Sequence, residues 1–421
     1  MQSPFAWDSF SDQPAQLKDR TFKKKMRKKE FVSLLKTAFT ALAILPFSLV
    51  MTPFIRRKHI NSHDFFCLGV DFERYPQETL EMVKELGVSR ILVRFKLWEM
   101  EKLPQLKQFL MACQEKKVTL KIMQDRENIE DGALFENNLR TIFQELSGLV
   151  ELFEIGTTIN RAKWGFFSVD EYNRFFQIAY DLKEKEFPHA KLLGSGVIDF
   201  EYHFTAHTLF NLSKYRYDGV AALLYVDRRG APENLQMGFD LSDKIALLST
   251  MTWLSPKSKH ALHITETNWP ITGTAPYAPT SEYECVSEEL YACFMLRYYL
   301  LALASQQVDS LSWHQLIAPG YGLVDSREGL RKREAFEVYK TMLRQLARAQ
   351  FLRLDIKRGY YICQFLVDEE LLQVHWSLTP TTLHAMPNFE ATSHTGQPLS
   401  DPILAVGEAP IYIKIKDERA Q

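Results

Sequence analysis

Short apolar runs alternate with longer amphipathic stretches over most of this sequence, and the alternation limits what the chain can fold into. A parallel strand covered on both faces reads as a continuous apolar run, and the helix that covers it repeats every 3.6 residues. Eight such pairs in about 285 residues is the count of a (β/α)8 barrel, the TIM barrel. The predicted strands are residues 65–70, 90–94, 118–123, 150–155, 191–197, 219–225, 262–266 and 310–313.

A helical pattern follows each run, and the pattern after the fifth run is the weakest. The chain has 421 residues, of which 46% are hydrophobic and 24% charged, so we expect a large core with an accessory part. The predicted helices are residues 78–86, 103–116, 135–146, 169–185, 204–212, 241–250, 287–305 and 333–348.

Charge and cysteine content exclude several classes of function. A net charge of -1 gives no general attraction to nucleic acid. The sequence has no Gly-rich phosphate loop, no CxxC pair and no histidine spacing suited to a metal, so we expect no metal and no cofactor. The cysteines are too few and scattered for a disulfide framework, and we expect them to fill the core: Cys67, Cys113, Cys285, Cys293 and Cys363.

The first sixty residues differ in kind from the rest. Residues 1–30 form a polar segment that becomes strongly basic, and residues 31–55 are almost entirely apolar. The 19 residues from 37 to 55 carry no charge, and at ~1.5 Å each they match the ~30 Å hydrocarbon core of a bilayer. No small-residue cleavage site is evident, so we predict a retained transmembrane anchor over residues 31–55.

Basic residues flank both ends of this segment and are more numerous before it. The positive-inside rule then predicts a single-pass protein of the bacterial inner membrane, with its barrel in the periplasm. A second arrangement stays open, because Pro46, Pro53 and Lys36 weaken a span and the free cysteines favour reducing surroundings. In that arrangement the segment is a membrane-surface helix and the barrel is cytosolic.

After residue 350 the pattern changes to short alternating strands separated by turn residues, which is typical of an antiparallel sheet. We predict a small β-sandwich over residues 350–416 that buttresses a barrel spanning residues 62–348. Its clearest strands are residues 353–356, 359–366, 371–376 and 411–415.

The strand ends are where a barrel of this kind builds its site. The seventh run ends in Glu266, and the other ends carry carboxylates, aromatic rings and hydrogen-bonding groups. A sugar needs this combination, because its C–H face stacks on a ring and its hydroxyls take hydrogen bonds. We predict a carbohydrate site whose substrate-binding residues are Arg94, Trp98, Asp125, Thr158, Asn160, His203, Tyr225, Trp269 and Trp313.

These strand ends resemble those of the (β/α)8 glycoside hydrolases of clan A, and the small C-terminal domain is similar too. The segment Ile264–Pro270, Ile-Thr-Glu-Thr-Asn-Trp-Pro, resembles the clan's nucleophile motif on strand seven. Arg94, Tyr225 and Trp313 match its arginine on strand two, tyrosine on strand six and tryptophan on strand eight. The resemblance implies that Glu266 is the catalytic nucleophile, which the arginine and tyrosine keep ionised and oriented.

The fourth strand departs from the clan's pattern. The clan's acid/base is the Glu of an Asn-Glu pair, whereas here Thr157 and Thr158 stand at those positions. A Thr hydroxyl is no general acid near neutral pH, and Glu154 lies four residues back, ~13 Å deeper in the barrel. Loss of the acid typically lowers the rate ~10²- to 10⁴-fold. The candidate replacements at neighbouring strand ends are Glu201, Asp227 and His314.

Two functions remain open. The first is a membrane-anchored glycosidase or transglycosylase that acts on a bacterial cell-envelope or exopolysaccharide glycan, with two carboxyl groups about 5.5 Å apart and a retaining mechanism. The second is a pseudoenzyme that binds or guides a glycan during polysaccharide assembly without cutting it. Both expect a poly- or oligosaccharide partner and contact with a membrane through the N-terminal helix.

Overall fold

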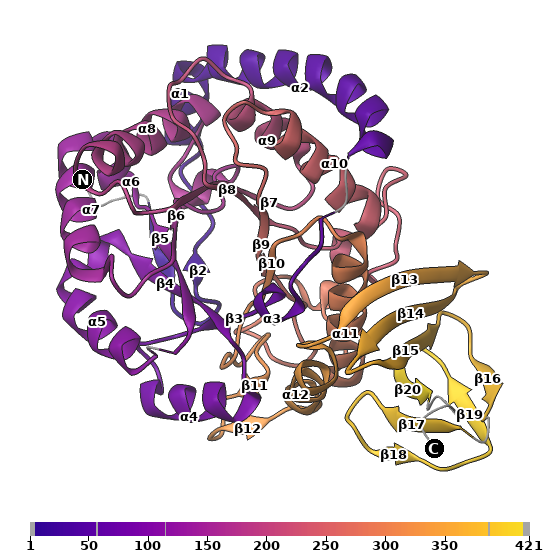
Figure 1. The fold of residues 1–421 in the computed structure, drawn as a ribbon. Coiled ribbons are helices and arrows are strands. Elements are labelled where there is room, and N and C mark those ends of the chain that lie inside the picture. The colour runs from indigo at the N-terminus through magenta and orange to yellow at the C-terminus, as the bar shows by residue number, and fades with distance from the viewer. Residues whose placement is uncertain (1–4, 56–57, 114, 386–387, 416–421) are drawn as a thin grey trace.

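Eight parallel strands close into a barrel in sequence order, with the eighth, β10, pairing with the first, β3 (Figure 1). The computed structural model describes residues 5–55, 58–113, 115–385 and 388–415, so residues 1–4 of the predicted basic segment and residue 416 of the predicted β-domain lie outside the described residues. The predicted TIM barrel is confirmed. Its strands are β3 (Phe66–Val70), β4 (Arg90–Lys96), β5 (Lys117–Met123), β6 (Leu152–Ile155), β7 (Leu192–Ile198), β8 (Gly219–Leu223), β9 (Leu262–Thr267) and β10 (Ser310–Trp313).

Helices surround the barrel, and their ends follow from local chemistry. The Ser168 hydroxyl accepts a hydrogen bond from the backbone N–H of Glu171 at 3.1 Å and so caps a helix start. Gly87 ends another helix with a φ of 68°, which favours glycine. The helix predicted least clearly, over residues 204–212, corresponds to α9, which is one of the shortest helices. The helices are α3 (Ser62–Phe65), α4 (Pro76–Leu86), α5 (Leu103–Ala112), α6 (Arg126–Glu130), α7 (Gly132–Leu146), α8 (Val169–Glu186), α9 (Tyr202–Leu209), α10 (Leu241–Leu254), α11 (Glu288–Ser305) and α12 (Glu334–Leu346).

The C-terminal residues form an antiparallel sheet domain, as predicted, and it includes strands that the sequence did not predict between residues 381 and 406. Glu233 joins it to the barrel: its carboxylate accepts from Arg297 on the buried helix α11 at 2.9 Å and from the Trp376 indole at 2.8 Å. Six strands form one sheet, β13 (Gln350–Lys357), β14 (Tyr360–Val367), β15 (Glu370–Ser377), β20 (Ile411–Ile415), β17 (Phe389–Ser393) and β18 (Pro398–Leu399), and two form another, β16 (Thr381–His384) and β19 (Ile403–Val406).

The N-terminal segment lies against the barrel. It comprises a hairpin of β1 (Trp7–Asp8) and β2 (Gln13–Pro14), then α1 (Arg20–Lys29), α2 (Phe31–Met51) and a short turn of helix, η1 (Thr52–Phe54). Helix α2 packs along α8, α9 and α10 on the outside of the barrel (Figure 1). Among the described residues, the helix of residues 31–54 is the one long and apolar enough to cross a membrane.

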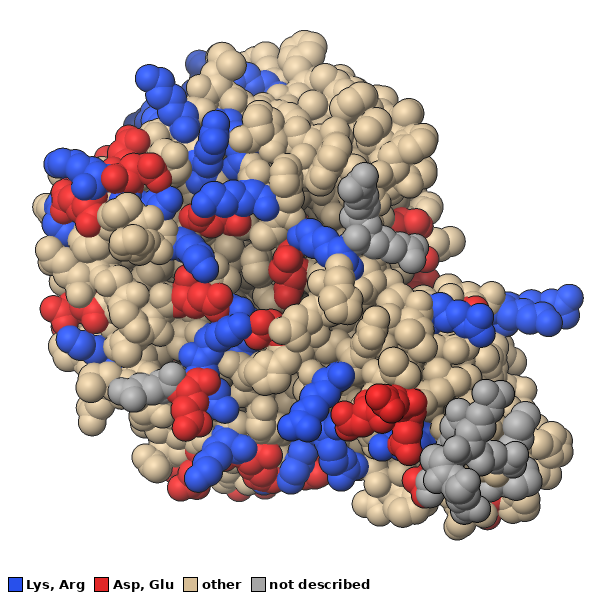
Figure 2. Space-filling view, in the orientation of Figure 1, with Lys and Arg blue, Asp and Glu red and all other residues tan. Residues whose placement is uncertain are grey.

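Helix α2 turns its polar side chains toward the barrel. The Thr37 hydroxyl lies 2.8 Å from Nδ1 of His207 on α9, and Lys36 pairs with Asp170 at 2.8 Å. The Ser33 hydroxyl accepts from the backbone N–H of the same Asp170 at 3.1 Å. The outward face is apolar, and the rim over its later turns carries no charged side chains in Figure 2. Its side chains are 43–72% exposed: Phe31, Val32, Leu35, Phe39, Leu42, Phe47, Leu49, Val50 and, in η1, Phe54.

Candidate active site at the mouth of the barrel

Glu266 lies near the end of β9, and two neighbouring strands supply its partners. The Tyr225 hydroxyl, just after β8, donates to Oε1 at 2.7 Å, and the Lys121 ammonium from β5 lies 3.2 Å from Oε2. Burial by itself would raise the pKa of Glu266, but the charges of Lys121, His314 and Arg94 and the Tyr225 hydrogen bond lower it to about 2. Glu266 is therefore an oriented carboxylate that stays ionised at neutral pH.

Lys121 is a candidate site residue that the sequence did not single out. Its ammonium lies inside the barrel, 3.6 Å from a Glu154 carboxylate oxygen, and neither side chain is exposed. Burial raises the pKa of Glu154 to about 7, although Lys121 and a hydrogen bond from Thr265 lower it. The sequence does contain a signal for this pair, because Lys121 and Glu154 lie inside predicted buried strands and a buried ion needs a partner of opposite charge. Glu154 is thus the inner partner of Lys121.

Arg94, the residue expected to hold the nucleophile, forms its ion pair with the N-terminal segment. Its guanidinium donates to the carboxylate of Asp12 in the β1–β2 hairpin. Burial would raise the pKa of Asp12, but Arg94, Lys96 and Arg74 lower it below its usual value, so this carboxylate is also ionised. The barrel mouth therefore already contains an anionic group supplied by the chain itself.

Aromatic contacts hold this hairpin over the barrel mouth. The Trp7 ring lies 5.4 Å from Trp98, which follows β4, and 6.0 Å from Trp164, which follows β6. Phe10 meets Tyr277 edge-on at 5.6 Å. The sequence predicts only a polar segment that precedes an anchor, because no local signal in it identifies the barrel mouth as its binding surface.

Thr158 occupies the strand-four position where the resemblance places an acid. Its side chain is buried, its φ is 52°, and its hydroxyl lies 3.3 Å from that of Thr157. Gln124 fixes the same turn, because its amide accepts from the Thr157 N–H and donates to the Thr157 carbonyl, both at 2.9 Å. The turn presents a hydroxyl to the site and no ionisable group.

The three candidate replacement acids lie in different surroundings. Glu201 accepts from Asn160 and Arg161, each at 2.7 Å, and is held by both. Asp227 is exposed at the start of a short 3-10 helix, η4 (Asp227–Arg229). His314 lies beside the nucleophile candidate and stacks on Tyr321 at 5.3 Å; burial lowers its pKa to about 4. Of the three, His314 lines the cavity beside Glu266, whereas Glu201 and Asp227 are not among the residues that line it.

A cavity of about 500 Å³ brings together six of the predicted site residues. Trp98 and Asp125 line a second cavity of about 540 Å³ beside it, together with Trp7 and Trp164. Groups of three or more His, Cys, Asp or Glu side chains suited to a metal ion are absent from the part of the chain that the structure describes. The six residues are Arg94, Thr158, Asn160, Tyr225, Glu266 and His314.

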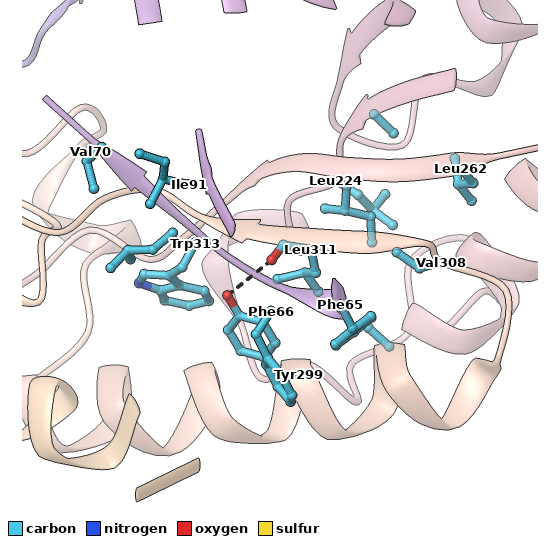
Figure 3. Close-up of a cluster of buried hydrophobic side chains, with 14 of the residues drawn as sticks. Phe65, Phe66, Val70, Ile91, Leu224, Leu262, Tyr299, Val308, Leu311 and Trp313 are labelled. Carbon is cyan, nitrogen blue, oxygen red and sulfur yellow. Dashed lines mark hydrogen bonds between the residues drawn. The ribbon is translucent and has the colours of Figure 1, made fainter. Parts of the chain in front are cut away.

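The prediction that the rings of Trp269 and Trp313 bind substrate in the cleft is wrong, because both side chains are 0% exposed. The rings stack on each other at 5.8 Å in the layer between strands and helices, and Trp313 lies in the core cluster near Tyr299 (Figure 3). The Trp313 indole donates to the Tyr291 hydroxyl at 2.7 Å. His203 is likewise absent from the lining of the described cavities; it packs against Phe204 at 4.6 Å.

Comparison with known proteins identifies the fold. No protein-family model and no curated protein matches the sequence. A family 39 glycoside hydrolase from Bacteroides cellulosilyticus WH2 is similar in structure, with a TM-score of 0.66, 14% identity, and 85% of this chain and 82% of that one covered. A GH39 β-xylosidase from Caulobacter crescentus gives a TM-score of 0.58 at 12% identity, with 86% and 98% covered.

A GH51 arabinofuranosidase from Xanthomonas axonopodis pv. citri gives a TM-score of 0.54 at 11% identity, with 86% of this chain and 98% of that one covered. A GH30 endoxylanase from Clostridium papyrosolvens C71 gives 0.58 at 7% identity, with 86% and 97% covered. The fold of clan A glycoside hydrolases, expected from the strand-end resemblance, is confirmed; identities this low speak to the fold alone.

Replacing Lys121 with Met should destabilise the protein by ~3–5 kcal/mol at pH 7, because two carboxylates lose their buried cation. Glu266, with a folded-state pKa of about 2 against a usual 4.5, stabilises the fold above pH 4.5, and that contribution is lost as the pH falls toward 2. In the variant the pKa of Glu266 rises, so the loss begins at higher pH. Chemical denaturation as a function of pH measures both effects.

The matched control is Lys117→Met on the same strand, since Lys117 is an exposed residue paired with Asp64. It should change the free energy of unfolding by less than ~1 kcal/mol. Equal losses for the two variants would contradict the role assigned to Lys121.

Replacing Asp12 with Asn should loosen the hairpin over the barrel mouth, because Arg94 loses the anion that holds it. Hydrogen–deuterium exchange of residues 5–16 should become roughly tenfold faster. Asp19→Asn is the control, since Asp19 lies in the same segment and Asn retains its capping hydrogen bond to α1. Unchanged exchange in the Asp12 variant would mean that aromatic packing alone holds the segment.

Proposed function

We propose that the protein acts on the O-glycosyl bonds of a bacterial cell-envelope or exopolysaccharide glycan, through a retaining-type site in which Glu266 is the nucleophile. The observation that carries the proposal is the state of Glu266. Its carboxylate is held ionised by Lys121 and oriented by Tyr225 at the edge of a cavity large enough for sugar rings. A carboxylate in this state can attack an anomeric carbon and form a glycosyl-enzyme.

The polar lining of the same cavity supports a carbohydrate ligand. Asn160 and Thr158 supply amide and hydroxyl groups from the fourth-strand turn, while Trp164 contributes a ring. The acid of this proposed site is non-standard, because the strand-four turn offers a hydroxyl. In the proposed reaction, Glu266 therefore acts on bonds whose leaving oxygen needs little or no protonation.

Glycan binding without cleavage is the second candidate function. Two observations favour it: Thr158 stands at the expected acid position, and the Asp12 carboxylate is already paired with Arg94 beside the nucleophile candidate. In this function the barrel binds or guides a glycan during polysaccharide assembly, and Glu266 serves as a hydrogen-bond acceptor for sugar hydroxyls.

Activated aryl glycosides separate the two functions, because their leaving groups depart without protonation. Wild-type protein should turn over at least one member of a broad panel of sugars, and Glu266→Gln should lower that rate roughly 10³-fold or more. Glu101→Gln, at an exposed site outside the cavity, should leave the rate unchanged. If no substrate in the panel reacts and Glu266→Gln alters only glycan affinity, the binding function is the correct one.

Of the two membrane arrangements, we propose that α2 lies flat on the membrane surface, with the N-terminal segment and the barrel on the same side. Residues before and after α2 both contact the barrel: Glu30 accepts from the Ser168 hydroxyl at 2.6 Å, and Lys58 donates to Asp309 at 2.7 Å. A helix spanning the bilayer would have to give up these contacts, or bring the charged flank of the barrel into hydrocarbon.

Charge supports the same orientation. Helix α1 comes directly before α2 in the chain, and most of its basic side chains are exposed. Basic residues beside an apolar helical face favour the surface of anionic lipids. The exposed basic residues of α1 that do not line the cavity are Arg20, Lys24, Lys25, Lys28 and Lys29.

The double substitution Phe39→Asp with Leu42→Asp should abolish flotation of the protein with phosphatidylglycerol vesicles, because two exposed apolar side chains that would enter the lipid become charged. Leu352→Asp with Ile403→Asp, at exposed apolar sites of the C-terminal domain, is the control and should still float.

Epitopes at the two chain ends should be accessible from the same side of the membrane in spheroplasts. Accessibility from opposite sides would establish a spanning helix instead.

A further inference from the structure

The cavity beside Glu266 is lined by more cations than the chain neutralises. Arg161 is paired with Asp199 and Glu201, each at 2.7 Å. Lys23, Arg27 and Lys163 also line this cavity, and within the described residues none of the three forms an ion pair. Uncompensated cations that converge on a pocket favour a ligand with negative charge.

Lys163 is the most informative of these cations because of its place in the chain. It lies in a 3-10 turn, η3 (Ala162–Trp164), in the loop that follows Thr158. Its ammonium donates to the side-chain oxygen of Gln13 at 2.7 Å, and burial together with Arg161 lowers its pKa below the usual value. In the chain, a cation thus comes shortly after Thr158, the position where the resemblance expects a proton donor.

A fixed cation and a proton donor both stabilise a leaving group, but they do so in different ways. A sugar alkoxide is a poor leaving group and needs a proton, whereas a phosphate or diphosphate leaves as a stable anion and needs its charge balanced. A site with an ionised nucleophile, no acid and several unpaired cations fits the second kind of leaving group. The Asp12 carboxylate on Arg94 indicates that the cavity region accommodates an anion.

We propose that the site takes a sugar whose anomeric carbon carries a phosphate or diphosphate, with Lys163, Lys23 and Arg27 binding that leaving group. This inference rests on the proposed role of Glu266. In the first step a Glu266 oxygen forms a bond to the anomeric carbon, and the bond from that carbon to the phosphate oxygen breaks, so the phosphate departs with the electron pair. Water or a sugar hydroxyl then displaces Glu266 and releases its proton to the departing phosphate or to solvent.

Binding of inorganic pyrophosphate to the full-length protein in detergent tests the cation site without requiring turnover. Calorimetry should detect binding to the wild type that weakens with added salt, and Lys163→Ala should weaken it about tenfold. Lys24→Ala is the matched control, since Lys24 is an exposed residue of α1 outside the cavity lining, and it should leave affinity unchanged. Equal thermal unfolding midpoints show that both variants are folded.

The absence of pyrophosphate binding, or equal weakening by the two variants, would overturn the inference and leave the aryl glycoside result untouched. Inorganic phosphate, run in parallel, separates the two ligands: tighter binding of pyrophosphate indicates a diphosphate leaving group, and equal binding indicates a monophosphate.

Turnover gives a second readout for whichever sugar reacts as a nitrophenyl glycoside. Lys163→Ala should lower kcat/KM for the corresponding glycosyl phosphate at least tenfold more than for the nitrophenyl glycoside, whose charge is spread over a ring. An equal loss on both substrates would assign Lys163 to the fold of the site and overturn its role at the leaving group. If neither substrate reacts, the proposed function itself fails, and the pyrophosphate titration still decides whether the cation site exists.

Discussion

The buried ammonium of Lys121 is the interaction on which the candidate site depends. It lies between Glu154 inside the barrel and Glu266 at its mouth, 3.6 and 3.2 Å from their carboxylate oxygens. Burial raises the pKa of both acids, and the Lys121 charge lowers the pKa of both. The outer carboxylate has a pKa of about 2 while the inner one has a pKa of about 7. The lower pKa of Glu266 reflects partners that Glu154 lacks, because His314, Arg94 and the Tyr225 hydrogen bond lower it in addition to Lys121.

The N-terminal segment also contributes charged side chains to the candidate site. Asp12 brings a carboxylate to Arg94, and the Trp7 ring of the hairpin contacts Trp98 and Trp164. Helix α1 then lines the cavity with cations, and α2 carries an apolar face away from the barrel. The N-terminal segment thus supplies side chains to the candidate site from its hairpin and α1, as well as the apolar helix. The cavity-lining residues of the hairpin and α1 and the exposed apolar face of α2 belong to one continuous stretch of chain.

Sequence reasoning located the barrel strands well because buried parallel strands leave an unambiguous apolar pattern. It also selected Glu266, Arg94 and Tyr225, which line one cavity, because strand ends converge in this fold. It misjudged Trp269 and Trp313, since a ring at a strand end can turn to the opening or to the layer beneath the helices, and local sequence does not state which. Charged residues inside two predicted buried strands hinted at an ion pair, but the sequence does not show that Lys121 faces both Glu154 and Glu266.

The sequence by itself determined the closed barrel, the antiparallel C-terminal domain, a helix apolar enough for a membrane, and a carboxylate at the end of the seventh strand. These follow from periodicity and chain order, which are local properties. Only the tertiary structure decided which acid is ionised, that Asp12 reaches Arg94, and that α2 turns its polar side chains toward the barrel. Those facts depend on contacts between residues far apart in the chain, where burial and opposing charges act together.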